Sequence, residues 1–306
     1  MLTYVQGNLL ESPAQVLVNP VNTEGVMGKG LAKDFKRIYP DMFKQYQRYC
    51  ENGQLTVGKL WLYKTPHKWV LNFPTKTTWR KPSQLSYIEQ GLQAFANAYV
   101  RKGINSIAFP QLGCGNGELN WDHQVRPLME RILKNLPIEV YIHLYAKGRV
   151  LPEHRSLAEI EKWLHREPCT LAFAEWWRDL TDLVTRKREW QALGTKQPFT
   201  AEIAGNVLRL KAGEREKTLA QEEVGTLWDV LRGYGILTVG QIPNGMQVWA
   251  NELLALLAEL PYCHLTHAAA EYKAIGDMTA YGVQLIPMTV DTVQEAEVFT
   301  LKAANQ

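Results

Sequence analysis

The chain has 306 residues, of which 46% are hydrophobic and 21% charged, a composition typical of a globular protein. At roughly 100–200 residues per domain, this length predicts two domains. No apolar stretch approaches the ~18 residues that a membrane helix needs, and the N-terminus lacks the pattern of a secretory signal. The four cysteines form no CxxC pair, so we expect a reduced, cytoplasmic protein without a metal, a cofactor or a membrane partner.

The net charge of +3 conceals an asymmetry between the two halves. Residues 1–150 carry 19 Lys and Arg against 10 Asp and Glu, a net +9, whereas residues 151–306 carry 15 against 21, a net −6. A basic half favours a polyanionic ligand, such as a nucleic acid or a pyrophosphate compound. An acidic half fits either a basic protein partner or an ordinary solvated surface.

Predicted strands alternate with predicted helices over residues 1–150, which indicates an α/β sheet with both faces covered. Short segments rich in Val, Ile, Leu and aromatic residues predict strands over 3–6, 16–21, 59–63, 69–73, 106–110 and 139–145. Apolar residues at helical spacing predict helices over 30–52, 83–102 and 122–135.

The second half has a different pattern. Residues 151–197 are predicted to be helical, with a break at Pro168 and an end at Pro198. Residues 198–306 are predicted to mix helices and strands: a hairpin over 199–211, helices over 220–232 and 246–260, and a strand over 281–290. We therefore expect domains at 1–150 and 151–306. Because consecutive helical residues point about 100° apart, we expect one ring of the pair Trp176 and Trp177 to face outward.

A first candidate motif joins the predicted strand 16–21 to the following helix. Asn19 and Asn22 precede a glycine-rich loop, 25–30, that opens the helix. Glycines let backbone N–H groups approach a phosphate at the positive end of a helix, so this loop is a candidate anion cradle. The alternative is a plain strand-to-helix turn that needs glycine.

A second glycine loop, 113–117, follows the predicted strand 106–110 and also precedes a helix. Ligands of open α/β sheets lie beyond the carboxyl ends of the strands, where two such loops would converge. Cys114 is a conceivable nucleophile in this loop. No fixed histidine partner is evident, and a small residue also suits a tight turn.

A third motif follows the predicted strand 69–73. Thr75 and Lys76 are succeeded by Trp79, Arg80 and Lys81. A lysine in a partly desolvated site can act as a nucleophile or a proton donor, although a solvated surface lysine is the more ordinary alternative. An aromatic ring between cations is typical of a surface that stacks a base and holds its phosphate.

Together these segments resemble the ADP-ribose-binding macrodomains, and more narrowly their DarG antitoxin branch, which is related to the terminal ADP-ribose protein glycohydrolases. The resemblance covers residues 1–148. It rests on Gly7-Asn8-Leu9-Leu10, the Asn-x-x-Asn of Asn19 and Asn22, Gly25-Val26-Met27-Gly28-Lys29-Gly30, Asn72-Phe73-Pro74-Thr75-Lys76 and Leu112-Gly113-Cys114-Gly115.

This resemblance implies an α/β/α sandwich over a mixed sheet, with Lys76 as the catalytic residue and ADP-ribose as the ligand. The nucleic acid is expected to contact Trp79, Arg80 and Lys81. The residues that the resemblance places around ADP-ribose are Gly7, Asn8, Leu9, Asn19, Asn22, Gly25, Val26, Met27, Gly28, Lys29, Gly30, Thr75, Gly113, Cys114, Gly115, Asn116 and Gly117.

Two positions depart from the family pattern. Many macrodomains have Asp where this chain has Asn8, whose amide oxygen can still accept a hydrogen bond from adenine. The lysine-dependent relatives have Asp where this chain has Gly117, followed by Glu118. Lys76 would then act with a backbone oxyanion site, a water or the substrate's own phosphate.

The function implied by the resemblance is a DNA ADP-ribosyl glycohydrolase, which removes ADP-ribose that a DarT-type toxin has placed on DNA bases. The alternatives are a macrodomain that binds ADP-ribose without cleaving it and a glycohydrolase acting on protein or RNA. The second half is expected to bind the basic toxin directly. The alternative is a domain that only dimerises.

Overall fold

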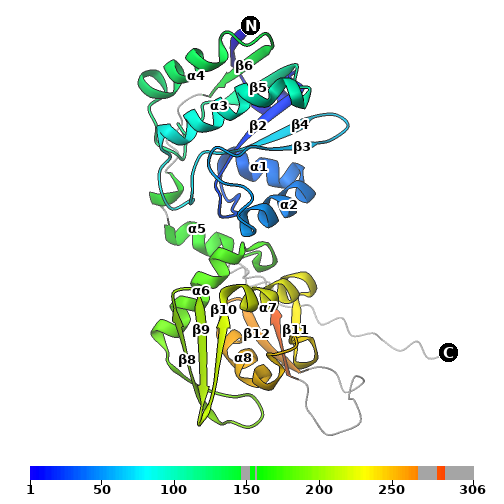
Figure 1. Cartoon of the computed structure of the whole chain (residues 1–306), viewed down its shortest axis with the longest axis vertical. Helices are drawn as coiled ribbons and strands as arrows, with labels where there is room; N and C mark the ends of the chain where they lie inside the picture. Colours follow the sequence, from blue (N-terminus) through cyan, green and yellow to red (C-terminus); the bar gives the residue numbers. More distant parts are fainter. Residues whose placement is uncertain (146–151, 156, 268–280, 287–306) are drawn as a thin grey trace, which may run out of the picture.

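The structure, a computed structural model, describes residues 1–145, 152–155, 157–267 and 281–286. The first half is built on one mixed sheet in the order β1-β6-β5-β2-β4-β3 (Figure 1). Neighbouring strands are parallel except β3, which runs antiparallel to β4. The six expected strands are confirmed to within two residues: β1 (Leu2–Gln6), β2 (Val16–Val21), β3 (Trp61–Lys64), β4 (Trp69–Pro74), β5 (Ser106–Pro110) and β6 (Glu139–Leu144).

Helices cover both faces of this sheet, which confirms the macrodomain sandwich. One apolar cluster joins Leu17 and Val21 of β2 to Phe35 and Tyr46 on helices α1 (Gly30–Ile38) and α2 (Pro40–Glu51). A second cluster joins the opposite face to helices α3 (Leu85–Lys102) and α4 (Arg126–Leu133). Because β2 is buried on both faces, its apolar residues run almost without interruption instead of alternating with polar ones.

The single helix expected over 30–52 is wrong, because two helices meet at Tyr39 and Pro40. Proline has no N–H to donate, and it disfavours the helical conformation of the residue before it. Tyr39 accordingly leaves the helical region, with φ −126° and ψ 69°, and Pro40 starts the new helix. The helix expected over 83–102 is confirmed and ends at Gly103, which adopts the left-handed conformation with φ 72°.

The second half contains two antiparallel sheets, β10-β9-β8-β7 and β11-β13-β12. Its longer helices are α5 (Leu157–Leu164), α6 (Phe173–Arg186), α7 (Gln221–Tyr234) and α8 (Ala250–Leu257). The strands are β7 (Glu189–Gln191), β8 (Pro198–Ala204), β9 (Val207–Ala212), β10 (Arg215–Ala220), β11 (Ile236–Thr238), β12 (Cys263–His267) and β13 (Tyr281–Leu285).

The prediction that residues 151–197 are wholly helical is wrong at β7. This strand pairs with β8, and its buried Trp190 stacks on Phe199 with ring centroids 5.9 Å apart. The hairpin of β8 and β9 and the helices at α7 and α8 are confirmed. Strands β10, β11 and β12 were not expected, and residues 287–290 of the expected last strand lie outside the described residues.

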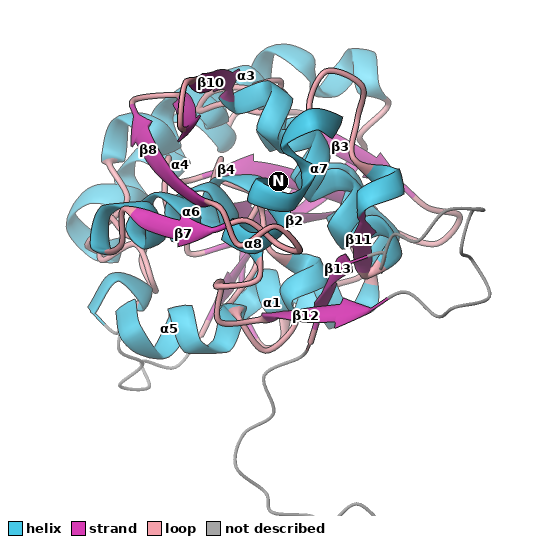
Figure 2. Ribbon diagram, turned by 90° about the horizontal axis from the view of Figure 1, so that it is seen from below, coloured by secondary structure: helices cyan, strands magenta, loops and turns pink. Residues whose placement is uncertain are grey.

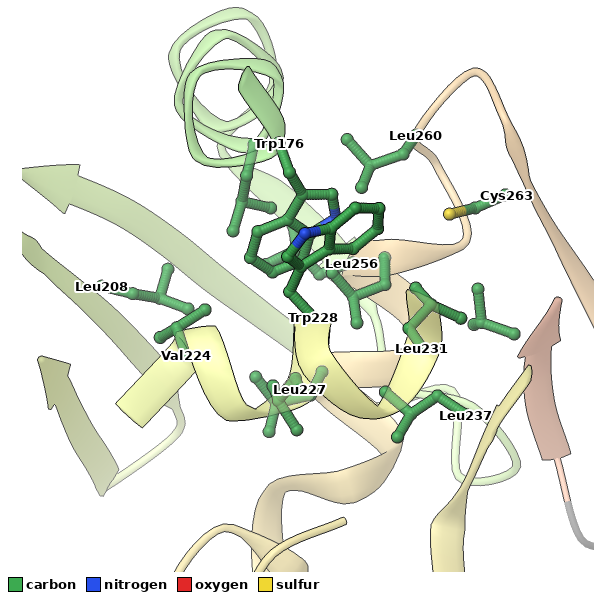
Figure 3. Close-up of a cluster of buried hydrophobic side chains, with 14 of the residues drawn as sticks. Trp176, Leu208, Val224, Leu227, Trp228, Leu231, Leu237, Leu256, Leu260 and Cys263 are labelled. Atoms are coloured by element: carbon green, nitrogen blue, oxygen red, sulfur yellow. The ribbon is translucent and has the colours of Figure 1, made fainter. Parts of the chain in front are cut away.

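Buried tryptophans form the centre of the second core. Trp176 on α6 and Trp228 on α7 stack with centroids 5.2 Å apart, and leucines of α7 and of the segments around α8 surround them (Figure 3). The expected outward ring is wrong, because Trp176 is 0% exposed and Trp177 is 8% exposed. Helix α6 is covered on both of these sides, and Trp177 also packs against Phe173 one turn earlier.

The two halves lie end to end, with α5 between the large sheet and the smaller ones (Figure 1). Figure 2, seen from the end that carries the smaller sheets, shows α8 between β7 on one side and β12 and β13 on the other, in agreement with its contacts. None of the described helices is long and apolar enough to cross a membrane.

Two glycines on helices test the packing. We expect Gly91→Ala, on α3, to lower the free energy of unfolding by about 1–3 kcal/mol, because a Cβ there would overlap with the ring of Phe73. The matched control is Gly233→Ala on α7, where no atom lies within 4 Å of the added Cβ. Helix propensity alone predicts that the control gains up to about 1 kcal/mol. Thermal unfolding measures both variants, and equal shifts in Tm would contradict the packing of α3 against Phe73.

Candidate active site

The carboxyl ends of five parallel strands share one edge of the large sheet. Three of the candidate loops leave this edge beside one another, because β2 lies between β5 and β4. They are residues 22–30 after β2, residues 75–81 after β4 and residues 111–118 after β5. The structure therefore brings together the three motifs that are far apart in the sequence.

Lys76 lies where these loops meet. Its side chain is buried, with the residue only 6% exposed, and its Nζ donates a hydrogen bond to the carbonyl oxygen of Asn116 at 2.7 Å. The preceding residue, Thr75, donates its backbone N–H to Val21 at 2.8 Å, which extends the pairing of β4 with β2. The amine is thus held between the strand end and the second glycine loop, largely away from water.

The first glycine loop is shaped by Asn22. Its amide donates to the carbonyl of Val26 at 2.6 Å, and its Oδ1 accepts from the backbone N–H groups of Glu24 and Val26. The hydroxyl of Tyr46 donates to the Asn22 carbonyl at 2.7 Å, and burial raises the pKa of Tyr46 well above its usual value. Asn22 therefore holds the shape of the loop, and its contact with ADP-ribose stays a prediction.

Several side chains of the first loop point into cores. Asn19 is 0% exposed and donates to Oδ1 of Asn72 at 3.0 Å, so it lies within the sheet and its predicted contact with ADP-ribose does not fit the structure. Val26 and Met27 are also buried. Gly25 and Gly28 are buried as well, so within residues 25–30 only Lys29 and Gly30, at the start of α1, are not buried.

The second glycine loop is closed against its surroundings. A Cβ on Gly117 would overlap with Oγ of Ser83 and with the Gly113 carbonyl, and the Gly117 carbonyl accepts from the Ser83 N–H at 3.0 Å. The Asp of lysine-dependent relatives therefore has no room at this position. A Cβ on Gly30 would lie 3.2 Å from Nδ2 of Asn116, so the two glycine loops touch. The half-buried thiol of Cys114 donates to the Leu112 carbonyl at 3.3 Å.

The segment after β1 forms the far end of the same edge. Asn8 caps a short 3-10 turn, Leu9–Glu11, by accepting from the Leu10 N–H at 3.1 Å. Leu9 is buried and Asn8 is exposed, so the amide of Asn8 remains accessible to a ligand. A ring nitrogen of His143 lies 3.2 Å from the Gly7 carbonyl and fixes this turn to the end of β6.

The expected nucleic-acid contacts at Trp79 and Arg80 do not fit the structure. Trp79 is 0% exposed and donates its indole N–H to Glu175 at 3.0 Å. Arg80 binds both oxygens of Glu175, at 2.6 and 2.7 Å, and also Glu161 at 3.1 Å. A ring that is fully covered cannot stack a base. Of this predicted group, only Lys81 has an exposed side chain.

Glu175, on helix α6, receives this cationic loop in a buried position. Burial alone would raise the pKa of its carboxyl, but the hydrogen bonds and charges of Arg80 and Arg178 and the hydrogen bond of Trp79 lower it below the usual value. An ionised carboxylate inside a protein is stable only when it is paired in this way. Glu175 lies almost one hundred positions from the loop it binds, and no pattern in the sequence marks it as a partner of that loop.

Two further contacts come from the second half. Trp163 of α5 lies against the first glycine loop, where a Cβ on Gly28 would be 3.0 Å from its ring. Lys33 and Lys36 of α1 lie over the same ring. On the second loop, Glu118 has a positive φ of 60° and binds His154 at 2.7 Å and Arg155. Among the described residues, no group of three or more His, Cys, Asp or Glu could hold a metal.

The known proteins to which this chain is similar match its first half. The family model "Macro domain" matches residues 18–128. A Thermus aquaticus protein named "DNA ADP-ribosyl glycohydrolase" is 42% identical over 147 residues, which are 47% of this chain and 41% of that protein. A "DNA ADP-ribosyl transferase-DNA ADP-ribosyl glycohydrolase fusion protein" of Thermosipho africanus is 39% identical over 168 residues, 49% of this chain and 43% of that one.

Among solved structures, the macrodomain of Mycobacterium tuberculosis DarG is 41% identical, with a TM-score of 0.46, and the match covers 48% of this chain and 99% of that chain. The chain thus spans about two fifths of the length of the curated relatives it matches.

The lack of space around Gly117 can be tested by adding a side chain there. We expect Gly117→Ala to weaken ADP-ribose binding at least about tenfold, equivalent to ~1.4 kcal/mol, because the added Cβ must displace Ser83 or the loop itself. Gly240→Ala, with no atom within 4 Å of its Cβ, is the control that should bind as the unchanged chain does. Titration calorimetry measures both, and full affinity in Gly117→Ala would place the ligand elsewhere.

Proposed function

We propose that this chain, of which residues 18–128 match the family model "Macro domain", is a hydrolase that removes ADP-ribose from bases of DNA. The observation that carries this proposal is the position of Lys76, a buried amine at the carboxyl edge of the sheet between two glycine loops. The name of the Thermus aquaticus relative, "DNA ADP-ribosyl glycohydrolase", supports DNA as the carrier. The proposed domains are a macrodomain over 1–150 and an acidic domain over 151–306, in a protein of the cytoplasm.

We place the pyrophosphate of ADP-ribose between the backbone N–H groups of loops 25–30 and 113–117. The glycines of both loops let a phosphate approach the backbone, and loop 25–30 also leads into the N-terminus of α1. The adenine is proposed to lie near Gly7, Asn8 and Leu9. The distal ribose then lies near Lys76 and Thr75, at the contact between the two glycine loops.

The reaction would break the N-glycosidic bond between C1″ of the distal ribose and the base. The bonding electron pair leaves with the base nitrogen, which takes up a proton, while a water oxygen bonds to C1″ and releases one. The amine of Lys76 can protonate the leaving nitrogen or attack C1″ to form an intermediate that water then hydrolyses. Since Gly117 leaves no room for the relatives' Asp, Lys76 acts here with the Asn116 carbonyl, a water or the substrate phosphate.

The rival function is a module that binds ADP-ribose without cleaving it. The missing Asp favours this rival, whereas a lysine held out of water at the meeting point of the loops favours hydrolysis. A binding module requires the glycine loops, whereas proton donation or nucleophilic attack requires the amine as well. A hydrolase acting on modified protein or RNA shares the same chemistry and differs only in the carrier of ADP-ribose.

The first test is Lys76→Ala. We expect hydrolysis of ADP-ribosylated oligonucleotides to be lost while ADP-ribose affinity stays within about tenfold, because a group that acts on the transition state changes the rate more than the binding of the ground state. The control is Lys68→Ala. Lys68 is another lysine whose Nζ donates to backbone carbonyls, those of Ser12 and Ala14, and it lies at the opposite end of the sheet. Gel separation of the products measures the rate. Hydrolysis by Lys76→Ala at the unchanged rate would leave only the binding function.

We further propose that the second half binds a DarT-type toxin, a DNA ADP-ribosyl transferase. The Thermosipho africanus relative carries transferase and glycohydrolase in one chain, so the two activities occur together. The net −6 of residues 151–306 complements a basic partner that handles DNA.

Co-expression tests this partner. The full chain with Lys76→Ala should co-purify with the toxin and reduce its toxicity, because sequestration needs no hydrolysis. Growth of cells carrying both genes and capture of the complex are the measurements. The outcome that contradicts binding is toxicity equal to that of the toxin alone, with no complex recovered.

A further inference from the structure

Each of the three loops at the candidate site is held by a residue of the second half. Loop 22–30 packs against Trp163, loop 75–81 is bound by Glu175, and loop 111–118 is bound through Glu118 by His154 and Arg155. Other contacts between the halves fall on helices α1 and α2, such as Lys36 with Glu167 and Arg232 with Glu51. Because the remaining contacts reach all three loops of the site, the second half is placed to affect the loop geometry.

Glu175 is the central contact of this set. Its residue is 3% exposed, and its carboxylate accepts from the Trp79 indole, from Arg80 through two hydrogen bonds and from Arg178 at 3.1 Å. A buried carboxylate with this many charged donors has little freedom to move, because any shift breaks several charge-assisted bonds in a low dielectric.

The same network reaches the first glycine loop. Glu24 accepts from the Thr78 hydroxyl at 2.7 Å and from the Trp79 N–H at 3.3 Å, and it lies 3.5 Å from Arg178. Arg178 therefore joins Glu24 of the first loop to Glu175 of α6. Loops 22–30 and 75–81 are therefore joined directly through Glu24, and a second time through Arg178 and Glu175 of α6.

Lys76 lies between the two ends of this restraint. At one end Thr75 is bound to Val21 of β2, and at the other end Trp79 and Arg80 are bound to Glu175. Only three residues, 76–78, separate these fixed points. A displacement of about 1 Å at a reacting group can cost on the order of 100-fold in rate.

On the basis of the proposed function, we propose that Glu175 is a positioning residue for the hydrolysis: it holds loop 75–81 so that the Lys76 amine stays opposite the Asn116 carbonyl. Glu175 contacts no substrate in this scheme. It acts through Trp79 and Arg80, which explains why these two residues turn inward and not toward a nucleic acid. The second half is then part of the catalytic apparatus of the first.

If Glu175 only stabilised the fold, replacing it would affect kcat no more than replacing another buried, paired carboxylate. The chain offers such a carboxylate as a control. Glu252 of α8 is also buried, at 4% exposed, and binds Arg215 of β10 at 2.8 Å, within the second half. Removing the charge of either carboxylate leaves an arginine without its partner, Arg80 with 17% and Arg215 with 47% of its side chain exposed, and should lower the stability of the fold. Only Glu175 is joined to the loop that carries Lys76.

The experiment compares Glu175→Gln with Glu252→Gln in the full chain. It measures kcat and KM on ADP-ribosylated oligonucleotide, ADP-ribose affinity by calorimetry and Tm, and the rates are taken well below both Tm values. We expect Glu175→Gln to lower kcat at least tenfold with KM and ADP-ribose affinity within about threefold, and Glu252→Gln to lower Tm with kcat within twofold. The proposal is overturned if kcat of Glu175→Gln stays within twofold of the unchanged chain, or if the two variants lose kcat equally.

Arg80→Lys is the second variant, in case Glu175→Gln does not fold. It keeps the positive charge but cannot form the two-pronged bond to Glu175. We expect a fall in kcat with unchanged KM, and a rise in KM alone would instead make Arg80 a nucleic-acid contact and overturn the inference. If the unchanged chain fails to hydrolyse the oligonucleotide, the proposed function itself is wrong. If the unchanged chain is active and all variants match it, only the role of Glu175 is wrong.

Discussion

The shared carboxyl edge of five parallel strands is the constraint on which the rest of the structure depends. Parallel strands need a crossover between each pair, and here the helices that supply the crossovers cover both faces of the sheet. The loops that leave the strands must then gather at one edge. Motifs more than 80 residues apart in the chain become neighbours for this reason, as Gly30 and Asn116 do.

That constraint explains why much of the first half could be predicted from the sequence. Both-face burial makes β2 and β4 almost continuous apolar segments, and glycines mark where the backbone must turn or approach a ligand. The loop residues were therefore found at the correct edge, with Lys76 among them. The chief error in this half, the helix over 30–52, came from giving the apolar periodicity more weight than Pro40, which cannot continue a helix.

The sequence was less informative wherever the outcome depended on tertiary contact. Trp79 and Arg80 have the composition of a nucleic-acid surface, and only the distant Glu175 turns them inward. The aromatic stretch before Pro198 has helical spacing as far as α6. Trp190 then joins a strand, because β8 offers it a buried partner. No local pattern encodes either pairing, since each partner on its own is compatible with a surface or a core position.

The contacts between the halves also bear on the charge asymmetry. Some pairs join a cation of the first half to an acid of the second, as Lys36 does with Glu167 and Arg80 with Glu175. Others run in the opposite direction, as Arg232 does with Glu51 and Arg178 with Glu24. Because the pairs among the described residues run in both directions, docking of the halves does not neutralise the +9 of one against the −6 of the other. Each half therefore keeps its net charge when the halves dock. In the proposed function, modified DNA meets the basic first half and the toxin meets the acidic second half, and the two halves need not separate to bind both partners.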